Sequence, residues 1–162
     1  MKTILVKGPA LSRSGYGEQT RFALRSLRAH EERFNILLQN IPWGKTGWIT
    51  DNGEERDWLD HIIGKTQHHI NQRLPIDISL QVTIPNEWEK IAPVNIGYTA
   101  GIETTMVSPQ WIEKANIMDR IIVVSNHSKN IYEQTVYEAT IEETQQKTDL
   151  KIHTPVEVVN YP

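Results

Sequence analysis

Apolar segments of strand length alternate with amphipathic segments of helix length about five times along the chain. The strand-like segments are residues 3–7, 34–41, 77–84, 94–99 and 120–124, and a shorter one covers 156–159. Helical periodicity and capping residues predict helices over 18–30, 54–72, 109–115 and 127–137. Because strands that alternate with helices pair in parallel through right-handed crossovers, this order predicts an open, mainly parallel sheet with helices on its faces.

The predicted fold class is therefore α/β, in the form of a Rossmann-like three-layer αβα sandwich. Two segments give weaker indications. Residues 88–91 are predicted to form a short helical turn after Pro85. Residues 139–154 are polar and poorly periodic, so no element is predicted there.

Charge and cysteine content exclude several classes of protein. The 17 Lys and Arg residues are balanced by 20 Asp and Glu, and the net charge of -3 gives no basic stripe for nucleic acid. With no cysteine, the chain has no disulfides, thiolate zinc sites or cysteine nucleophile. The apolar run at residues 4–6 is too short for a signal peptide or a transmembrane segment. We therefore expect a cytoplasmic protein with no nucleic-acid partner.

Ligands of open parallel sheets bind beyond the carboxyl ends of the strands, so four loops are of interest: 8–17, 42–53, 100–108 and 125–129. In the first loop, Gly15 and Gly17 precede a helix, where backbone N–H groups and the helix dipole favour an anion. Thr20 occupies the third glycine position of a dinucleotide fingerprint, and no P-loop lysine follows. The competing interpretation is a tight turn that needs positive φ and binds nothing.

The second loop contains two tryptophans, Trp43 and Trp48, on either side of a segment that includes Lys45. Exposed indole rings suit stacking on a sugar or on a partner surface. The alternative is that each ring packs beneath its own loop.

The last two loops carry polar residues. Glu103 follows the fourth strand, where a carboxylate can orient sugar hydroxyls or act as a base, or can simply be solvated. Ser125 and Asn126 can hydrogen-bond a ligand, but capping of the next helix explains them equally. The sequence predicts no metal site and no cofactor.

Taken in order, these segments resemble the N-terminal domain of group 1 (family 4) glycosyltransferases, which have the two-domain GT-B fold. The resemblance rests on Ser14-Gly-Tyr-Gly17, on Ile96–Glu103, on Pro109 and Trp111, and on Asp119–Lys129. It covers nearly the whole chain and is firmest at residues 15–17 and 95–129.

The resemblance implies a retaining glycosyltransferase that moves a sugar from a nucleotide sugar to a saccharide or other hydroxyl acceptor. Residues 1–155 would be the acceptor-side domain, and 156–162 would begin the connection to a C-terminal nucleotide-sugar domain. That missing domain carries the family's Glu-x7-Glu element, and no two glutamates of this chain have the spacing. We therefore expect the isolated chain to be inactive.

The resemblance also implies roles for individual residues. Those facing the donor phosphates and sugar would be Gly15, Tyr16, Gly17, Ser125 and Asn126. Glu103 would contact the transferred sugar as the candidate catalytic residue, and the acceptor side would include Trp43, Lys45 and Trp48. A β-branched residue at Gly17 should then impair transfer in the full-length protein without unfolding it.

A second hypothesis remains open. The chain can instead be a stand-alone Rossmann-like or flavodoxin-like module that binds a small anion or a protein partner and catalyses nothing.

Overall fold

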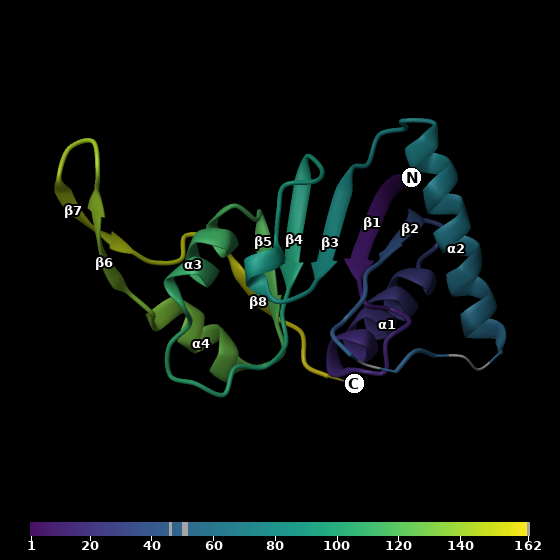
Figure 1. Cartoon of the computed structure of the whole chain (residues 1–162), viewed down its shortest axis with the longest axis horizontal. Helices are drawn as coiled ribbons and strands as arrows, with labels where there is room; N and C mark the ends of the chain where they lie inside the picture. The colour runs from purple at the N-terminus through teal and green to yellow at the C-terminus, as the bar shows by residue number, and fades with distance from the viewer. Residues whose placement is uncertain (46, 50–51, 162) are drawn as a thin grey trace. The chain divides into compact units, whose positions relative to one another are not determined.

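The computed structural model describes residues 1–45, 47–49 and 52–161 (Figure 1). The strands are β1 (Lys2–Gly8), β2 (Phe34–Asn40), β3 (Ile78–Val82), β4 (Val94–Tyr98), β5 (Arg120–Val123), β6 (Tyr137–Ile141), β7 (Gln146–Leu150) and β8 (Val156–Val158). The α-helices are α1 (Gly15–Arg28), α2 (Glu54–Asn71), α3 (Pro109–Asn116) and α4 (Asn126–Gln134), and a 3-10 helix, η1, covers Pro85–Glu87.

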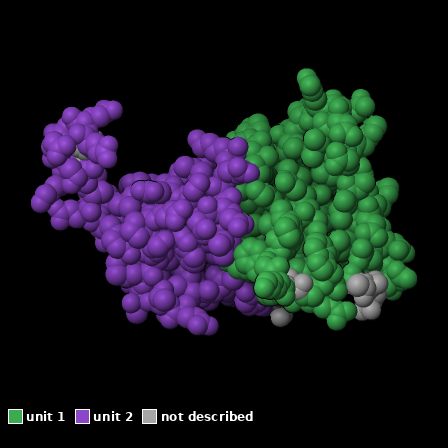
Figure 2. All heavy atoms as spheres, in the orientation of Figure 1, with its two compact units in different colours: residues 1–83, 91–95 green, residues 84–90, 96–162 purple. Residues whose placement is uncertain are grey.

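Six strands form one sheet in the order β2-β1-β3-β4-β5-β8. β1 pairs in parallel with β2 and with β3, and β5 pairs in parallel with β4 and with β8. The structure thus confirms the predicted α/β class, with a mainly parallel, Rossmann-like sheet flanked by helices. The chain divides into two compact units, residues 1–83 with 91–95 and residues 84–90 with 96–162 (Figure 2).

Unit 1 is built around β1, which lies between β2 and β3. β1 and β2 are apolar at their centres because both of their faces are covered: Leu5, Val6 and Leu37 are almost completely buried. Helix α1 packs on β1, β2 and β3, and α2 packs on β2. The chain leaves β1 toward β2 on one side and later returns as β3 on the other side. β1 and β3 therefore form a topological switch point, where ligands of open α/β sheets bind.

One face of β3 is polar although it is buried. Ser79 and Gln81 are completely covered, and Gln81 Nε2 donates to Ser79 Oγ at 3.0 Å. Ser79 Oγ donates in turn to Asn95 Oδ1 at 2.7 Å. The same amide oxygen accepts the backbone N–H groups of Ile91 and Ala92. Asn95 therefore joins the middle of β3 to the segment that leads into β4, and the buried polar groups are satisfied.

The core of unit 2 surrounds Trp88, which is completely buried among residues of α3, α4, β5 and β8. Gly97 of β4 lies against the indole ring, and a Cβ atom there would be 2.5 Å from Trp88 Cε2. A side chain cannot occupy that space without moving the ring. Gly97 is therefore required by the close approach of the indole to the strand backbone.

Serine side chains cap the starts of three helices, and Ser125 is one of the predicted caps. Ser108 caps α3 and Ser125 caps α4, each through its side-chain oxygen. Helix α1 begins three residues before the predicted start because Ser14 caps it and Gly15 is already helical. Helix α4 ends at Gln134 instead of residue 137.

Two predictions for the second half of the chain are wrong. The predicted turn at 88–91 is absent; the 3-10 turn lies before it, at Pro85–Glu87, and Trp88 follows in extended conformation. Residues 139–154 were expected to form no element, but most of them belong to an antiparallel hairpin of β6 and β7. Within the described ranges, no helix combines the length and the apolar character needed to cross a bilayer.

Candidate functional site

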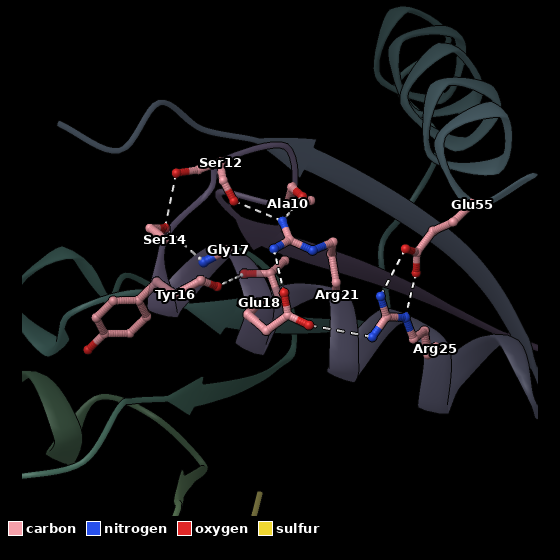
Figure 3. Close-up of polar contacts among 10 residues, drawn as sticks. Ala10, Ser12, Ser14, Tyr16, Gly17, Glu18, Arg21, Arg25 and Glu55 are labelled. Carbon is pink, nitrogen blue, oxygen red and sulfur yellow. Dashed lines mark hydrogen bonds and ion pairs between the residues drawn. The ribbon is translucent and has the colours of Figure 1, made fainter. Parts of the chain in front are cut away.

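The loop between β1 and α1 is held by one buried arginine of α1. Arg21 is 5% exposed, and its Nη1 donates to the carbonyl oxygens of Ala10 at 2.7 Å and Ser12 at 2.8 Å. Its Nη2 donates to Glu18 Oε2 at 2.7 Å (Figure 3). The guanidinium therefore satisfies two loop carbonyls and has its charge balanced by Glu18. This support fixes the conformation of the loop at the switch point.

The start of α1 is capped from within the same loop. Ser14 Oγ accepts the backbone N–H of Gly17 at 3.0 Å and the hydroxyl of Ser12 at 3.0 Å (Figure 3). The N–H of Gly17 is thus already bonded to the cap. Of the two glycine amides expected to face donor phosphates, the one at Gly17 has a structural partner inside the loop.

The two glycines of this loop differ in the space around them. A Cβ atom on Gly17 would overlap the carbonyl oxygen of Ser12 and lie 2.9 Å from that of Pro9. A Cβ atom on Gly15 would meet no atom within 4 Å. Neither residue has positive φ. The interpretation of a tight turn that needs positive φ is therefore wrong here, and Gly17 is required by close backbone packing.

Thr20, which occupies the third glycine position of the fingerprint, is completely buried. Its hydroxyl donates to the carbonyl oxygen of Tyr16 at 2.6 Å. A Cβ atom on Gly8 would lie 2.6 Å from Thr20 Oγ1. The glycine that permits close helix–strand packing is therefore on the strand, at Gly8, and not on the helix.

The first and second loops of unit 1 are joined to each other. The N–H of Arg13 donates to the carbonyl of Gly47, and the N–H of Ile49 donates to that of Leu11, each at 2.8 Å. These bonds flank an isolated antiparallel bridge between Ser12 and Trp48.

Aromatic side chains of the same two loops also meet. The ring centroids of Tyr16 and Trp43 are 4.7 Å apart with a tilt of 49°. Figure 3 shows the Tyr16 ring directed away from the Arg21 network. Trp48 is 51% exposed and Lys45 is exposed. Within unit 1 the structure thus brings the predicted donor-facing Tyr16 beside the predicted acceptor-side Trp43. Residues 46, 50 and 51 of this predicted loop lie outside the described residues.

The remaining candidates belong to unit 2. Ser125 Oγ accepts the N–H of Ser128 at 3.1 Å and donates to Ser128 Oγ, so its hydroxyl serves as the α4 cap. Ser128 Oγ also accepts the N–H of Ile102 at 3.4 Å, which holds the segment beside Glu103 near the start of α4. Glu103 and Asn126 are both exposed. The strand-end loops of unit 2 therefore lie together, with one exposed carboxylate and one exposed amide.

Sequence reasoning missed the residues that support the first loop. Arg21 was not among the candidate residues, although its position three residues after Glu18 is typical of an ion pair. Asn40 was also missed; its Oδ1 accepts the N–H of Leu11 at 3.1 Å. The sequence offered one indication of this contact: an asparagine near the carboxyl end of a predicted strand, where its side chain can bond a neighbouring loop.

A pocket of about 390 Å³ lies elsewhere in unit 1, between α2 and the start of β2. Its lining includes Phe34, Trp58 and Lys65. None of the predicted site residues lines this pocket. Lys65 Nζ donates to Asn35 Oδ1 at 3.0 Å, and burial lowers the pKa of Lys65. Within the described part of the chain, no three His, Asp or Glu side chains are grouped so that they could hold a metal ion.

No model of a protein family, no curated protein and no solved structure matches the chain. The indications of function therefore lie in the loops themselves.

Proposed function

We propose that the chain is the acceptor-binding half of a retaining glycosyltransferase, which moves a sugar from a nucleotide-sugar donor to a hydroxyl acceptor. The observation that carries the proposal is the junction of the two loops at the carboxyl ends of β1 and β2. There the Tyr16–Trp43 ring pair and the exposed Trp48 gather in one unit beside the topological switch point.

Aromatic rings of this kind suit a saccharide. A sugar ring presents apolar C–H faces that pack on an indole, while its hydroxyls require hydrogen-bonding groups at the rim. The exposed ammonium of Lys45 lies in the same loop as the two tryptophans and can supply donors. These residues support the acceptor role.

Of the two loop glycines, Gly15 is the better candidate to bind the donor through its backbone N–H. The N–H of Gly17 already bonds to Ser14 Oγ, whereas Gly15 is exposed at the first position of α1. A helix N-terminus favours an anion such as a diphosphate. In unit 2, the exposed Glu103 is proposed to contact the transferred sugar, and the exposed Asn126 is proposed to face the donor.

The first test is binding of saccharides to the purified chain. Titration of a panel of mono- and disaccharides, followed by NMR of the tryptophan indoles, should shift the Trp43 and Trp48 resonances. Trp48→Ala should weaken binding roughly tenfold, because an exposed stacking ring is worth about 1–2 kcal/mol. Trp58→Ala, on α2 and outside both loops, is the matched control. No shift with any saccharide would argue against the acceptor role.

The second test is activity. In the proposal, the 162-residue chain does not transfer sugar from any nucleotide sugar, because the donor is positioned by a second domain. Turnover by the chain alone would contradict its assignment as half of an enzyme.

A second candidate is a stand-alone binding module for a small anion. It is favoured by the order β2-β1-β3-β4-β5, which is that of flavodoxin-like sheets with their ligand at the β1/β3 switch point. Binding of inorganic phosphate or a nucleoside diphosphate that Gly15→Val abolishes, with no saccharide binding, would support this module over the transferase.

A further inference from the structure

The β6–β7 hairpin extends away from α3 and α4 in unit 2 (Figure 1). It forms a two-stranded antiparallel sheet of its own, separate from the main sheet. At its base, the Tyr137 hydroxyl donates to the carbonyl oxygen of Val107 at 2.7 Å, and Leu150 packs against the core. Residues 146–149 of β7 are all exposed. The base is therefore anchored, while most of β7 faces solvent.

The charges of the hairpin are incompletely paired. Glu138 lies directly opposite Asp149 in the strand register, an arrangement of like charges that destabilises a sheet. Lys147 Nζ is 3.1 Å from Glu138 and offsets part of the repulsion. Across the residues that the structure describes, no basic group lies within ion-pair distance of the Asp149 carboxylate. Among the described residues, Asp149 therefore has no ion-pair partner within its own chain.

A hairpin with exposed strands is a site for further strand pairing. Each edge of a two-stranded sheet presents backbone N–H and C=O groups that an added strand can bond. A two-stranded hairpin is also only marginally stable in water, and added strands stabilise it.

The sequence of β7 complements itself in the antiparallel direction. If two β7 strands pair about Thr148, Lys147 of each lies opposite Asp149 of the other, and the two Thr148 residues face each other. β6 has no such property, because pairing about Ala139 sets Glu138 against Thr140.

We propose that two copies of this chain associate through their β7 strands, which pair antiparallel about Thr148 into a four-stranded sheet. The dimer is symmetric, so the contact between Lys147 of one copy and Asp149 of the other occurs twice. Each Asp149 gains the lysine that it lacks within its own chain. The proposal concerns self-association and is independent of the proposed sugar transfer.

Sedimentation equilibrium over roughly 10–500 µM protein tests the proposal. The unmodified chain should form dimers toward the upper end of this range, and added salt should weaken them. Lys147→Asp and Asp149→Lys should each weaken self-association about tenfold or more, because each sets two pairs of like charges opposite one another. Glu142→Lys, in the exposed turn between the strands, is a matched charge change outside the pairing.

A mixture of the two single variants gives the sharpest result. A chain with Lys147→Asp is complementary to a chain with Asp149→Lys, so the 1:1 mixture should recover dimers that neither variant forms alone. The double variant should recover them as well. Hydrogen exchange of the β7 amides at the free edge of the hairpin should slow as the protein concentration rises.

Three outcomes would overturn the proposal. One is an unmodified chain that stays monomeric throughout the concentration range. Another is undiminished dimerisation of both single variants, which would assign the contact to a different surface. The third is failure of the mixture to associate when circular dichroism shows both variants folded.

Discussion

The buried guanidinium of Arg21 donates a hydrogen bond of 2.8 Å to the carbonyl oxygen of Ser12. The same group also bonds the carbonyl of Ala10 and the carboxylate of Glu18. One side chain of α1 thus determines the shape of the loop that precedes the helix. The loop owes its order to this contact more than to the conformational freedom of its glycines.

Arg21→Ala should lower the free energy of unfolding by about 2–4 kcal/mol, since it leaves the carbonyl oxygens of Ala10 and Ser12 without their donor. Denaturant titration measures the loss. Arg25→Ala is the matched control on the same helix; Arg25 is half exposed, and its ion pairs with Glu55 and Glu18 should contribute less than about 1 kcal/mol. Equal losses for the two variants would contradict the assigned role of Arg21.

Substitution of the two loop glycines should change the stability of the chain by different amounts. Gly17→Ala should destabilise the chain by about 1–3 kcal/mol, because the new methyl group overlaps the Ser12 carbonyl. Gly15→Ala should change stability by less than about 1 kcal/mol, because that Cβ meets open space. Thermal unfolding of both variants checks this prediction, and a Gly17→Ala chain as stable as the unmodified one would refute it.

This difference changes the expectation for a β-branched residue at Gly17. The sequence predicted that such a substitution would impair sugar transfer without unfolding the protein. The overlap of a Cβ atom with the Ser12 carbonyl oxygen predicts instead that the loop itself is disturbed. Gly15→Val, whose Cβ atom would meet no atom within 4 Å, is the informative substitution for ligand binding.

Gly97→Ala should destabilise unit 2 by about 2–3 kcal/mol, because the added methyl group would lie 2.5 Å from the buried Trp88 ring. The Trp88 environment, followed by near-ultraviolet circular dichroism, should change as well. Gly101→Ala serves as the control, since its Cβ would be in ordinary contact with Val124 at 3.6 Å. A Trp88 spectrum unaltered by Gly97→Ala would show that the ring is not confined.

The Arg25–Glu55 pair should make a small contribution that depends on pH. The hydrogen bond from Arg25 holds the pKa of the Glu55 carboxyl below its ordinary value of 4.5. The folded state therefore gains stability above pH 4.5, and this gain disappears as pH falls through the lowered pKa.

Glu55→Gln should accordingly cost stability at pH 7, by less than about 1 kcal/mol for so exposed a pair, and should cost less at pH 3. Denaturant titrations at the two pH values compare it with the unmodified chain. Glu143→Gln, in the exposed hairpin turn, controls for the loss of one charge. A cost that is the same at both pH values would contradict the pairing.

The parallel sheet could be predicted because its strands are buried. Runs such as Ile4-Leu-Val6 and Ile36-Leu-Leu38 are apolar on both faces, and each is nearly inaccessible to solvent. Strand β7 of the hairpin could not, because residues 146–149 are polar, exposed to solvent and without apolar alternation. Trp88 was misplaced for a different reason: its burial depends on the space left by Gly97, which local periodicity does not encode.

The positions of the candidate loops followed from strand order, but their internal contacts did not. The Ser12–Trp48 bridge joins residues 36 positions apart in the chain, and no local pattern indicates it. Likewise, Ser125 was correctly identified as a possible cap, yet its link through Ser128 to Ile102 required the folded structure.

The Asn95 network has a consequence for how this chain could be divided or recombined. The boundaries between the two units fall after Thr83, Lys90 and Asn95, so each unit is made of two separate stretches of sequence. A single cut after Thr83 would remove Asn95 from the Ser79 hydroxyl that it accepts. Exchange of one unit between homologous genes would need three breakpoints instead of one, and the two units are therefore expected to be inherited together.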